Sequence, residues 1–415
     1  MTKPDSAPVG DTLPVDEAGA QEPTPYTDPV KSMMDDEAAI VEEPARRRRG
    51  WTRWLAIGVS ALLVLLLVAL GGAGWYFSGQ VVDVVHGPHS YPYPVVAVDD
   101  DTVTLPNNHD TTRVGVWGLD WGDGRAVIGE ITDINPETVT RRLLEGDRPT
   151  EGTDTRIDTW AYATDPQTDF GLTYSTVDIE GKLGKFPAWY VPADGDTWVI
   201  AVHGRNASPG EALRALPRFH ESGFPLLSVT HRNDVGAPDS PDGLHHLGAT
   251  EWEDVSAAVD YAVDNGARSV VLAGWSMGGA VVMSTLRNMD DPGLVAGVVL
   301  DSPVLDWSST LDKQGELRSL PGILTDVAKL IVEWRVDVDL DDLDQRLIAA
   351  DLTTPILLYC DIADETVAAD ASLEFAEAVP AELMTLVTTE VGHTASWNED
   401  PEAYEAALAT FLARL

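Results

Sequence analysis

The sequence predicts an α/β fold, a mostly parallel sheet with helices on both faces, preceded by a small β-rich segment and one N-terminal transmembrane helix. Three observations support this prediction. After about residue 173, short aliphatic runs alternate with helical stretches, which is typical of parallel strands joined by crossover helices. The stretch VVLAGWSMGGAVV, residues 270–282, reads as a buried strand that turns sharply into a helix. Residues 54–77 form one uncharged apolar run.

Composition and charge exclude some classes of function. The chain has 415 residues, 44% of them hydrophobic, so it can form a large domain plus an appendage. It contains 27 Lys and Arg residues and 68 Asp and Glu residues, and the resulting formal charge of -41 repels nucleic acid. The acidic residues are spread along the chain, which favours a solvated surface over a cation site. We therefore expect no nucleic-acid partner, no metal site and no cofactor.

The first 78 residues predict a membrane anchor. Residues 1–45 are rich in Pro, Asp, Glu, Ala and Thr, which predicts a disordered acidic tail. Residues 46–78 join a basic flank to the apolar run, which as a helix would be about 36 Å long and span a hydrocarbon core of about 30 Å. Five arginines precede the run and no Lys or Arg follows it before residue 113, so we expect a cytoplasmic N-terminus and an extracytoplasmic remainder. A cleaved signal peptide is the alternative.

Residues 79–160 predict a small β-rich extracytoplasmic segment. Short runs such as YPVVAV, DTVTL and AVIGEI are divided by Gly, Asn, Asp and Pro, which is typical of short strands and turns. No chemistry is evident in this segment. It could act as a spacer, as a platform that covers part of the next domain, or as a partner-binding unit.

Residues 161–415 predict the α/β domain. Two runs, YSTVDI and AWYV, are expected to form antiparallel edge strands, and a helix is expected to begin at Thr250 with Glu253 completing a capping box. An amphipathic stretch within about 306–347 is either a lid or an ordinary crossover helix. The expected parallel strands are WVIAV, PLLSV, SVVLAG, VAGVVL, PILLYC and LMTLVT.

Ser276 lies where the strand of residues 270–275 should end and a helix begin. A chain that reverses this sharply forces its central residue into a strained backbone conformation, so residues two positions away must be nearly free of side chains. Gly274 and Gly278 occupy those two positions. The G-x-S-x-G pattern predicts a nucleophile elbow, although a plain strand-to-helix turn could also contain a serine.

A serine nucleophile needs a base and an acid, and both are expected downstream. Asp364 follows the strand that ends at Cys360, and His393 follows the strand of about residues 384–388, so all three side chains should meet at one edge of the sheet. Asp361 and Asp301 are rival candidates for the acid. Cys360 is expected to pack as a small apolar side chain rather than to react.

An oxyanion hole should complete this site. Met277 follows the nucleophile and opens a helix, where free backbone N–H groups favour an anion. The second donor is expected from the strand end at His203 and Gly204, because the flexibility of that glycine lets the amide of Arg205 turn inward.

A polar cluster follows the strand PLLSV, at the same edge of the sheet. It consists of His231, Arg232, Asn233 and Asp234. Together with His203, these residues either contact substrate or brace the elbow from below, and bracing is the favoured interpretation.

The motifs HGRN, GWSMGG, DIADETV and GHTASW, in this order, resemble the oxyanion strand, nucleophile elbow, acid loop and histidine loop of the α/β-hydrolase superfamily. The resemblance covers about residues 173–415. The anchor, the β-rich segment and the motifs HRNDVGAP and LGATEWEDV are similar to membrane-anchored extracytoplasmic hydrolases of actinobacteria, which implies an esterase-like activity. One departure is YCDIAD, where relatives often carry His-Gly in place of Cys360 and Asp361.

These observations predict a membrane-anchored extracytoplasmic serine hydrolase. Ser276 would attack a small-molecule or lipid ester, His393 would transfer the proton, and Asp364 would orient the imidazole. An acyltransferase or an amidase could use the same residues. A non-catalytic envelope scaffold that keeps the fold is the alternative outside the enzymes.

Overall fold

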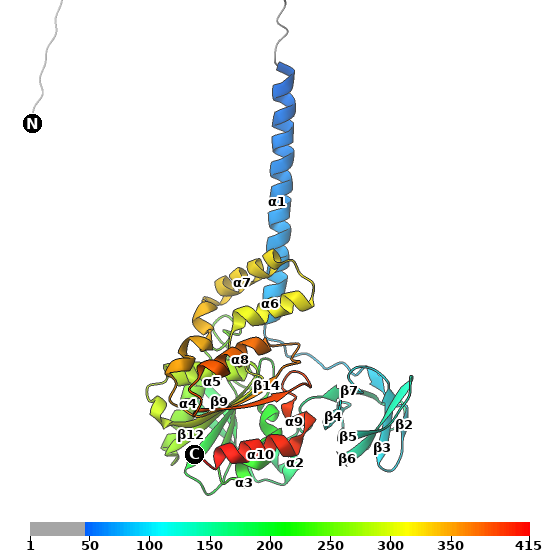
Figure 1. The fold of residues 1–415 in the computed structure, drawn as a ribbon, viewed down its shortest axis with the longest axis vertical. Coiled ribbons are helices and arrows are strands. Elements are labelled where there is room, and N and C mark those ends of the chain that lie inside the picture. Colours follow the sequence, from blue (N-terminus) through cyan, green and yellow to red (C-terminus); the bar gives the residue numbers. More distant parts are fainter. Residues whose placement is uncertain (1–45) are drawn as a thin grey trace, which may run out of the picture. The chain divides into compact units, whose positions relative to one another are not determined.

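The structure is a computed structural model that describes residues 46–415 (Figure 1). The predicted acidic tail, residues 1–45, lies outside the described residues. The first element, α1, runs from Arg46 to Val82 and is longer than the predicted apolar run. Its residues Trp51–Val82 have the length and composition to cross a membrane. Residues from Leu65 to Leu415 form one compact unit, which includes the last turns of α1.

The segment after α1 is β-rich, as predicted. Its strands pair antiparallel in one seven-stranded sheet of order β1-β7-β4-β5-β6-β3-β2. Alternating apolar residues such as Trp117, Leu119 and Ile128 are fully buried and form its core. The strands are β1 Tyr93–Pro94, β2 Ala97–Val98, β3 Thr102–Pro106, β4 Trp117–Asp120, β5 Arg125–Ile134, β6 Thr138–Gly146 and β7 Asp154–Asp158.

The second sheet has eight strands in the order β15-β14-β13-β12-β10-β11-β9-β8. The six strands from β15 to β11 are parallel, and β9 and β8 form the predicted antiparallel edge. The strands are β8 Ser175–Gly181, β9 Gly184–Val191, β10 Thr197–Val202, β11 Leu226–Val229, β12 Ser269–Trp275, β13 Val295–Asp301, β14 Ile356–Asp361 and β15 Met384–Thr389.

Helices cover both faces of this sheet, as the predicted fold class requires. Along β10, Ile200 and Val202 enter one core, whereas Val199 and Ala201 enter the other, because successive side chains of a strand point to opposite faces. The first core is covered by α4 Trp252–Asp264, α5 Met277–Asn288 and α8 Ala369–Ala378, and the second by α3 Leu216–Glu221 and α10 Pro401–Leu412. Shorter helices are α2 Pro166–Phe170 and α9 Ser396–Glu399, and the 3₁₀ turns include η2 Pro209–Arg214 and η3 Pro292–Leu294.

Two local predictions need comment. The helix expected at Thr250 begins at Trp252. The predicted capping box does not form, because the Thr250 hydroxyl pairs with His246 Nδ1 at 3.1 Å and the Glu253 carboxylate accepts from Lys182. The stretch 306–347 forms two helices, α6 Trp307–Leu317 and α7 Gly322–Val336, followed by 3₁₀ turns at Asp341–Leu343 and Gln345–Asp351. The boundary between the β-rich segment and the α/β domain at residues 160 and 161 stays a prediction.

Candidate active site

Ser276 occupies a strained turn between β12 and α5. Its backbone has φ 52° and ψ -120°, a left-handed conformation that non-glycine residues rarely adopt. A Cβ atom at Gly274 would lie 2.5 Å from the Gly278 carbonyl oxygen, and a Cβ at Gly278 would fall closer than 3.0 Å to the Val202 carbonyl oxygen. The two predicted glycines are therefore required by close backbone approach. Ser276 is half-buried and lines a cavity at the carboxyl end of β12.

His393 and Asp364 lie in one hydrogen-bonded chain with Ser276. His393 Nε2 is 2.9 Å from Ser276 Oγ, and His393 Nδ1 is 2.7 Å from Asp364 Oδ2. Because a carboxylate only accepts, Nδ1 carries a proton, and in the neutral ring Nε2 is then free to accept the hydroxyl proton. The Asp364 side chain is 4% exposed and that of His393 is 21% exposed. This arrangement can remove a proton from Ser276.

The acid loop fixes the direction of the Asp364 carboxylate. Its Oδ1 accepts from the backbone N–H groups of Thr366, at 2.7 Å, and Val367, at 2.9 Å. These bonds leave Oδ2 facing the histidine. Helix α6 holds the same loop from outside, since Lys313 donates to the carbonyls of Asp364 and Val367.

The rival acids face elsewhere. Asp361 accepts from the Thr389 hydroxyl at 2.8 Å and from the Val391 N–H at 2.7 Å, so it tethers the histidine loop. Asp301 is buried and accepts from the Tyr404 hydroxyl at 3.2 Å, and burial raises the pKa of Asp301 to about 6. Burial also raises the pKa of Cys360 to about 11, which disfavours a reactive thiolate.

The two residues expected to supply the oxyanion donors, Met277 and Arg205, lie near Ser276. Met277 is the first residue of α5, so its N–H has no acceptor one turn earlier. The strand end at Gly204 approaches the nucleophile, and a Cβ there would lie 3.1 Å from Ser276 Cβ. The Gly204 N–H donates to the buried Glu211 carboxylate at 2.7 Å, which fixes the loop that carries Arg205. The Arg205 side chain and Ser276 line the same cavity.

The polar cluster after β11 is buried rather than open to the cavities. His231, Arg232, Asn233 and Asp234 are 0–6% exposed, and none of them lines the two cavities described below. Arg232 donates to both carboxylate oxygens of Asp254 on α4, at 2.8 Å each. The arrangement favours the bracing interpretation over substrate contact.

His203 and Asp234 form the charged centre of that cluster. Their side chains meet at 2.8 Å, and the second ring nitrogen of His203 faces the Gly204 carbonyl at 2.9 Å. Burial alone would lower the pKa of His203, but the charge and hydrogen bond of Asp234 outweigh it and raise that pKa. Burial likewise opposes ionisation of Asp234, yet His203 and His231 lower its pKa to about 2. Because both ring nitrogens of His203 face acceptors, His203 and Asp234 form a charged pair next to the end of β10.

One group of metal-ligating residues occurs in the described part of the chain. The ligand atoms of His203, His231 and Asp234 lie within 4.8 Å of one another. A structural zinc site usually has four ligands, and this group offers three. Two of the three already bond to each other, and the His231 N–H donates to Asp234 at 2.7 Å. The donor set therefore fits a bracing ion pair better than a metal.

The β-rich segment braces the histidine loop, and sequence reasoning missed the residues that do so. Asn398 is fully buried, and its amide donates to the carbonyls of Val116 and Thr159 at 2.7 and 2.8 Å. Its amide oxygen accepts from Arg214, which also donates to the Thr394 carbonyl. Because these residues are far apart in sequence, no local pattern could have revealed them.

Buried Arg141 orders the loop that meets the histidine loop. Its guanidinium donates to the carbonyls of Arg113, at 2.6 Å, and Gly115, at 2.7 Å. Burial lowers its pKa to about 10. Arg113 in turn donates to the Val391 carbonyl at 2.9 Å, two residues before His393.

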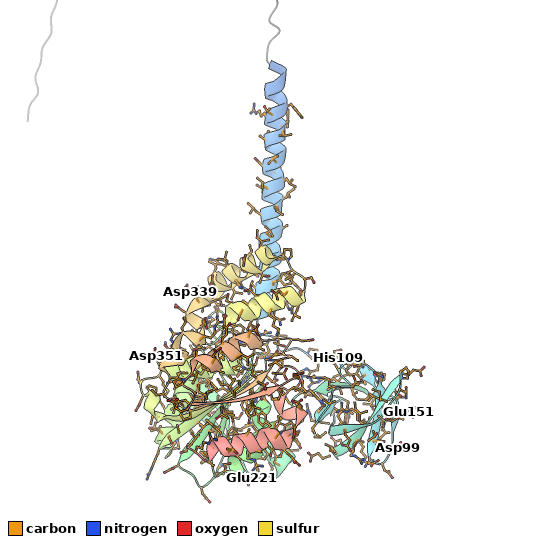
Figure 2. All side chains as sticks on the ribbon, in the orientation of Figure 1. Asp99, His109, Glu151, Glu221, Asp339 and Asp351 are labelled. Atoms are coloured by element: carbon orange, nitrogen blue, oxygen red, sulfur yellow. The ribbon has the colours of Figure 1, made fainter. Side chains whose placement is uncertain are left out.

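Two cavities flank the reactive groups. A polar cleft of about 980 Å³ reaches His393. It is lined by strand β7 and by loops of both parts of the chain, including His86, His109 and Arg113. Figure 2 places His109 on the side of the β-rich sheet nearest the larger part, whereas Asp99 and Glu151 lie at its far end. A smaller, mainly apolar cavity of about 160 Å³ contains Ser276 and lies under α6 and α7, which favours the lid interpretation of residues 306–347.

Comparisons with known proteins agree with this fold. Residues 194–348 match the family described as serine aminopeptidase, S33, and residues 94–158 match a domain of unknown function (DUF8805). An esterase from Pyrococcus furiosus is similar in structure, with 20% identity, a TM-score of 0.50, and coverage of 61% of this chain and 95% of that one. An esterase from Exiguobacterium antarcticum has 16% identity and a TM-score of 0.42, covering 58% of this chain and 100% of its own. No curated protein matches the sequence.

Proposed function

We propose that this member of the α/β-hydrolase superfamily is a serine hydrolase that cleaves carboxylic esters through an acyl-enzyme. The observation that carries the proposal is the chain of hydrogen bonds from Ser276 through His393 to Asp364, at 2.9 and 2.7 Å. The strained backbone at Ser276 adds support, because strain of this kind gathers at functional sites.

The proposed reaction has two half-reactions. Ser276 Oγ attacks the ester carbonyl carbon while His393 Nε2 takes the hydroxyl proton, and the N–H groups of Met277 and Arg205 stabilise the oxyanion. The tetrahedral intermediate breaks its bond to the alkoxide, which leaves as an alcohol with the proton from His393. Water then attacks the acyl-enzyme, gives its proton to His393, and releases the carboxylic acid while the proton returns to Ser276.

The two cavities support a division of the substrate. The apolar cavity at Ser276 suits an acyl group, and the polar cleft at His393 suits the leaving alcohol. The size of the polar cleft also favours a second candidate function, an acyltransferase in which a bound alcohol replaces water. An amide substrate would require the same residues and a protonated leaving amine.

We also propose that α1 anchors the enzyme in a membrane, with the N-terminus in the cytoplasm and the catalytic part outside. The support is the length and apolar composition of residues 54–77, within the candidate span Trp51–Val82, together with the arginines that precede them. Protease treatment of intact cells should remove the catalytic part. Cleavage only in inverted vesicles would reverse the topology.

The enzyme proposal is tested with a fluorophosphonate probe. The full-length chain should be labelled, and Ser276→Ala should not. Ser308→Ala, on α6 at the lid, is a matched serine control that should remain labelled. A folded wild-type chain that is not labelled would favour the non-catalytic scaffold.

A further inference from the structure

The last two turns of α1 are built into the catalytic part. Val82 and Ser78 are fully buried, and Val82 belongs to the same core as α4 and α5. The Val82 carbonyl accepts from the His245 N–H at 2.9 Å. The end of α1 is therefore packed as a core helix rather than as a tether.

Helix α7 crosses this end of α1 at close range. A Cβ atom at Gly74 would lie 2.7 Å from Val327 and 2.8 Å from Ile331, so the two helices approach too closely for a side chain. The rings of Trp75 and Trp334 lie 6.2 Å apart. Residues that pack this closely hold α7 in a fixed position relative to the helix.

Arg335, near the end of α7, stabilises the contact between α7 and α1 through hydrogen bonds and an ion pair. Its guanidinium stacks over the Trp75 ring at 4.6 Å, and it donates to Asp83 at 2.6 Å and to the Ser78 hydroxyl at 3.1 Å. The Arg335 side chain is 9% exposed, so this ion pair is shielded on one side from solvent.

This packing places α1 in the wall of the apolar cavity. Phe77 and Val81 line the same cavity of about 160 Å³ as Ser276, facing Leu311 of α6 and Val332 of α7. Phe77 is the last residue of the apolar run, and it is also a wall residue. The surface that would meet an acyl chain thus begins where the membrane-spanning run ends.

The outer surface of α6 and α7 is apolar beside that junction. Four large side chains are 53–74% exposed: Leu317, Ile323, Leu330 and Trp334. Soluble surfaces rarely gather such residues without a partner. Trp334 packs on Trp75, an aromatic residue at the end of the apolar run, where tryptophan is typical of the membrane interface. The apolar surface of α6 and α7 is continuous with the Trp75–Trp334 contact at the end of the apolar run. This continuity favours membrane lipid as the molecule that covers the surface.

We propose that the end of α1 forms one wall of the acyl pocket, and that the enzyme takes lipid-type acyl esters directly from the bilayer that its own anchor crosses. This inference rests on the proposed function, because it assumes hydrolysis at Ser276. It names the substrate class as long-chain acyl esters held in a membrane.

The wall is tested with two variants of opposite effect in the full-length chain in detergent, using p-nitrophenyl acetate and p-nitrophenyl decanoate. Val81→Trp fills the cavity, so the decanoate-to-acetate ratio of kcat/KM should fall about tenfold or more, since even one methylene can change specificity by about tenfold. Phe77→Ala enlarges the cavity and should raise the same ratio. Gly72→Trp introduces the same side chain on α1 at a position where no atom lies within 4 Å, and should leave the ratio unchanged.

The bilayer source is tested by placing a long-chain acyl ester either in the phosphatidylcholine vesicles that hold the protein or in separate vesicles. Hydrolysis should be much faster in the shared vesicles, and Trp334→Glu should reduce that advantage. Equal rates in both arrangements would overturn the bilayer source, and an unchanged ester ratio in both wall variants would overturn the wall. A wild-type chain that hydrolyses neither ester and takes no fluorophosphonate label would instead refute the proposed function.

Discussion

Replacing Asn398 with alanine should show that the β-rich segment positions His393. The substitution removes three hydrogen bonds of a fully buried side chain, two to the carbonyls of Val116 and Thr159 and one from Arg214. Each hydrogen bond contributes about 1 kcal/mol net, and a carbonyl left unsatisfied adds a penalty, so the free energy of unfolding should fall by about 3–5 kcal/mol. For a domain of this size it corresponds to a fall in Tm of roughly 10 °C.

The same change should loosen the loop that carries His393, which is five residues before Asn398. A displacement of about 1 Å at a reacting group can cost about 10²-fold in rate, so we expect kcat to fall about 10- to 100-fold with a smaller change in KM. Ester hydrolysis and thermal unfolding of the full-length chain in detergent provide both readouts.

Two further variants make this test specific. Asn398→Asp keeps an oxygen acceptor for Arg214 but places carboxylate oxygens against the two carbonyls of the β-rich side, so it should be at least as damaging as alanine. Asn265→Ala, which removes one exposed bond to the Tyr261 carbonyl, should change Tm by little. If the free energy of unfolding of Asn398→Ala falls by less than about 1 kcal/mol and kcat is normal, the bracing role is refuted.

Three other experiments test the site and its pH dependence, two of them with a control variant. Asp364→Asn should lower kcat by about 10⁴-fold, because it would stabilise the wrong tautomer of His393. Asp361→Asn should lower kcat for steady-state hydrolysis far less. Equal decreases in kcat would contradict the assignment of Asp364 as the acid. Gly278→Ala should prevent the elbow from forming and abolish fluorophosphonate labelling, while Gly322→Ala, with open space around it, should label normally. Burial raises the pKa of Asp301 to about 6, so the contribution of Asp301 to stability is present below about pH 4 and is lost as the pH rises through 6. The Tm of Asp301→Asn should lack this decline. A Tm profile parallel to that of the wild type would argue against this effect of Asp301.

The sequence predicted the parts of the site that depend on local sterics and on strand order. The two glycines around Ser276 follow from backbone crowding alone, and the structure has that crowding. Asp364 and His393 were located because each follows a strand whose carboxyl end must reach the same edge of the sheet. Their catalytic roles remain proposals.

The supporting residues could not be predicted in this way. Asn398 bonds to Val116 across 282 positions, and Lys313 reaches the acid loop across 51. Polar contacts of this kind have no periodicity and depend on tertiary placement. The missing capping box has a partly similar cause, since the distant residues Lys182 and Arg232 take the Glu253 carboxylate expected to complete it.

The proposed wall role of α1 could not be predicted from the sequence either. An apolar run with flanking arginines predicts an anchor equally well whether it ends in a loose tether or in a packed helix. The distinction lies in Gly74 and Val82, whose burial depends on α7 and the catalytic core.

The most direct test of the account is to trap the acyl-enzyme and locate it. The full-length chain is mixed with p-nitrophenyl decanoate, quenched in acid during the first turnover, digested and measured by mass spectrometry. We predict one decanoyl group per active chain, on the hydroxyl of Ser276, and a matching burst of nitrophenol. Hydrolysis that proceeds without a burst, or an acyl group on another residue, would contradict the central claim.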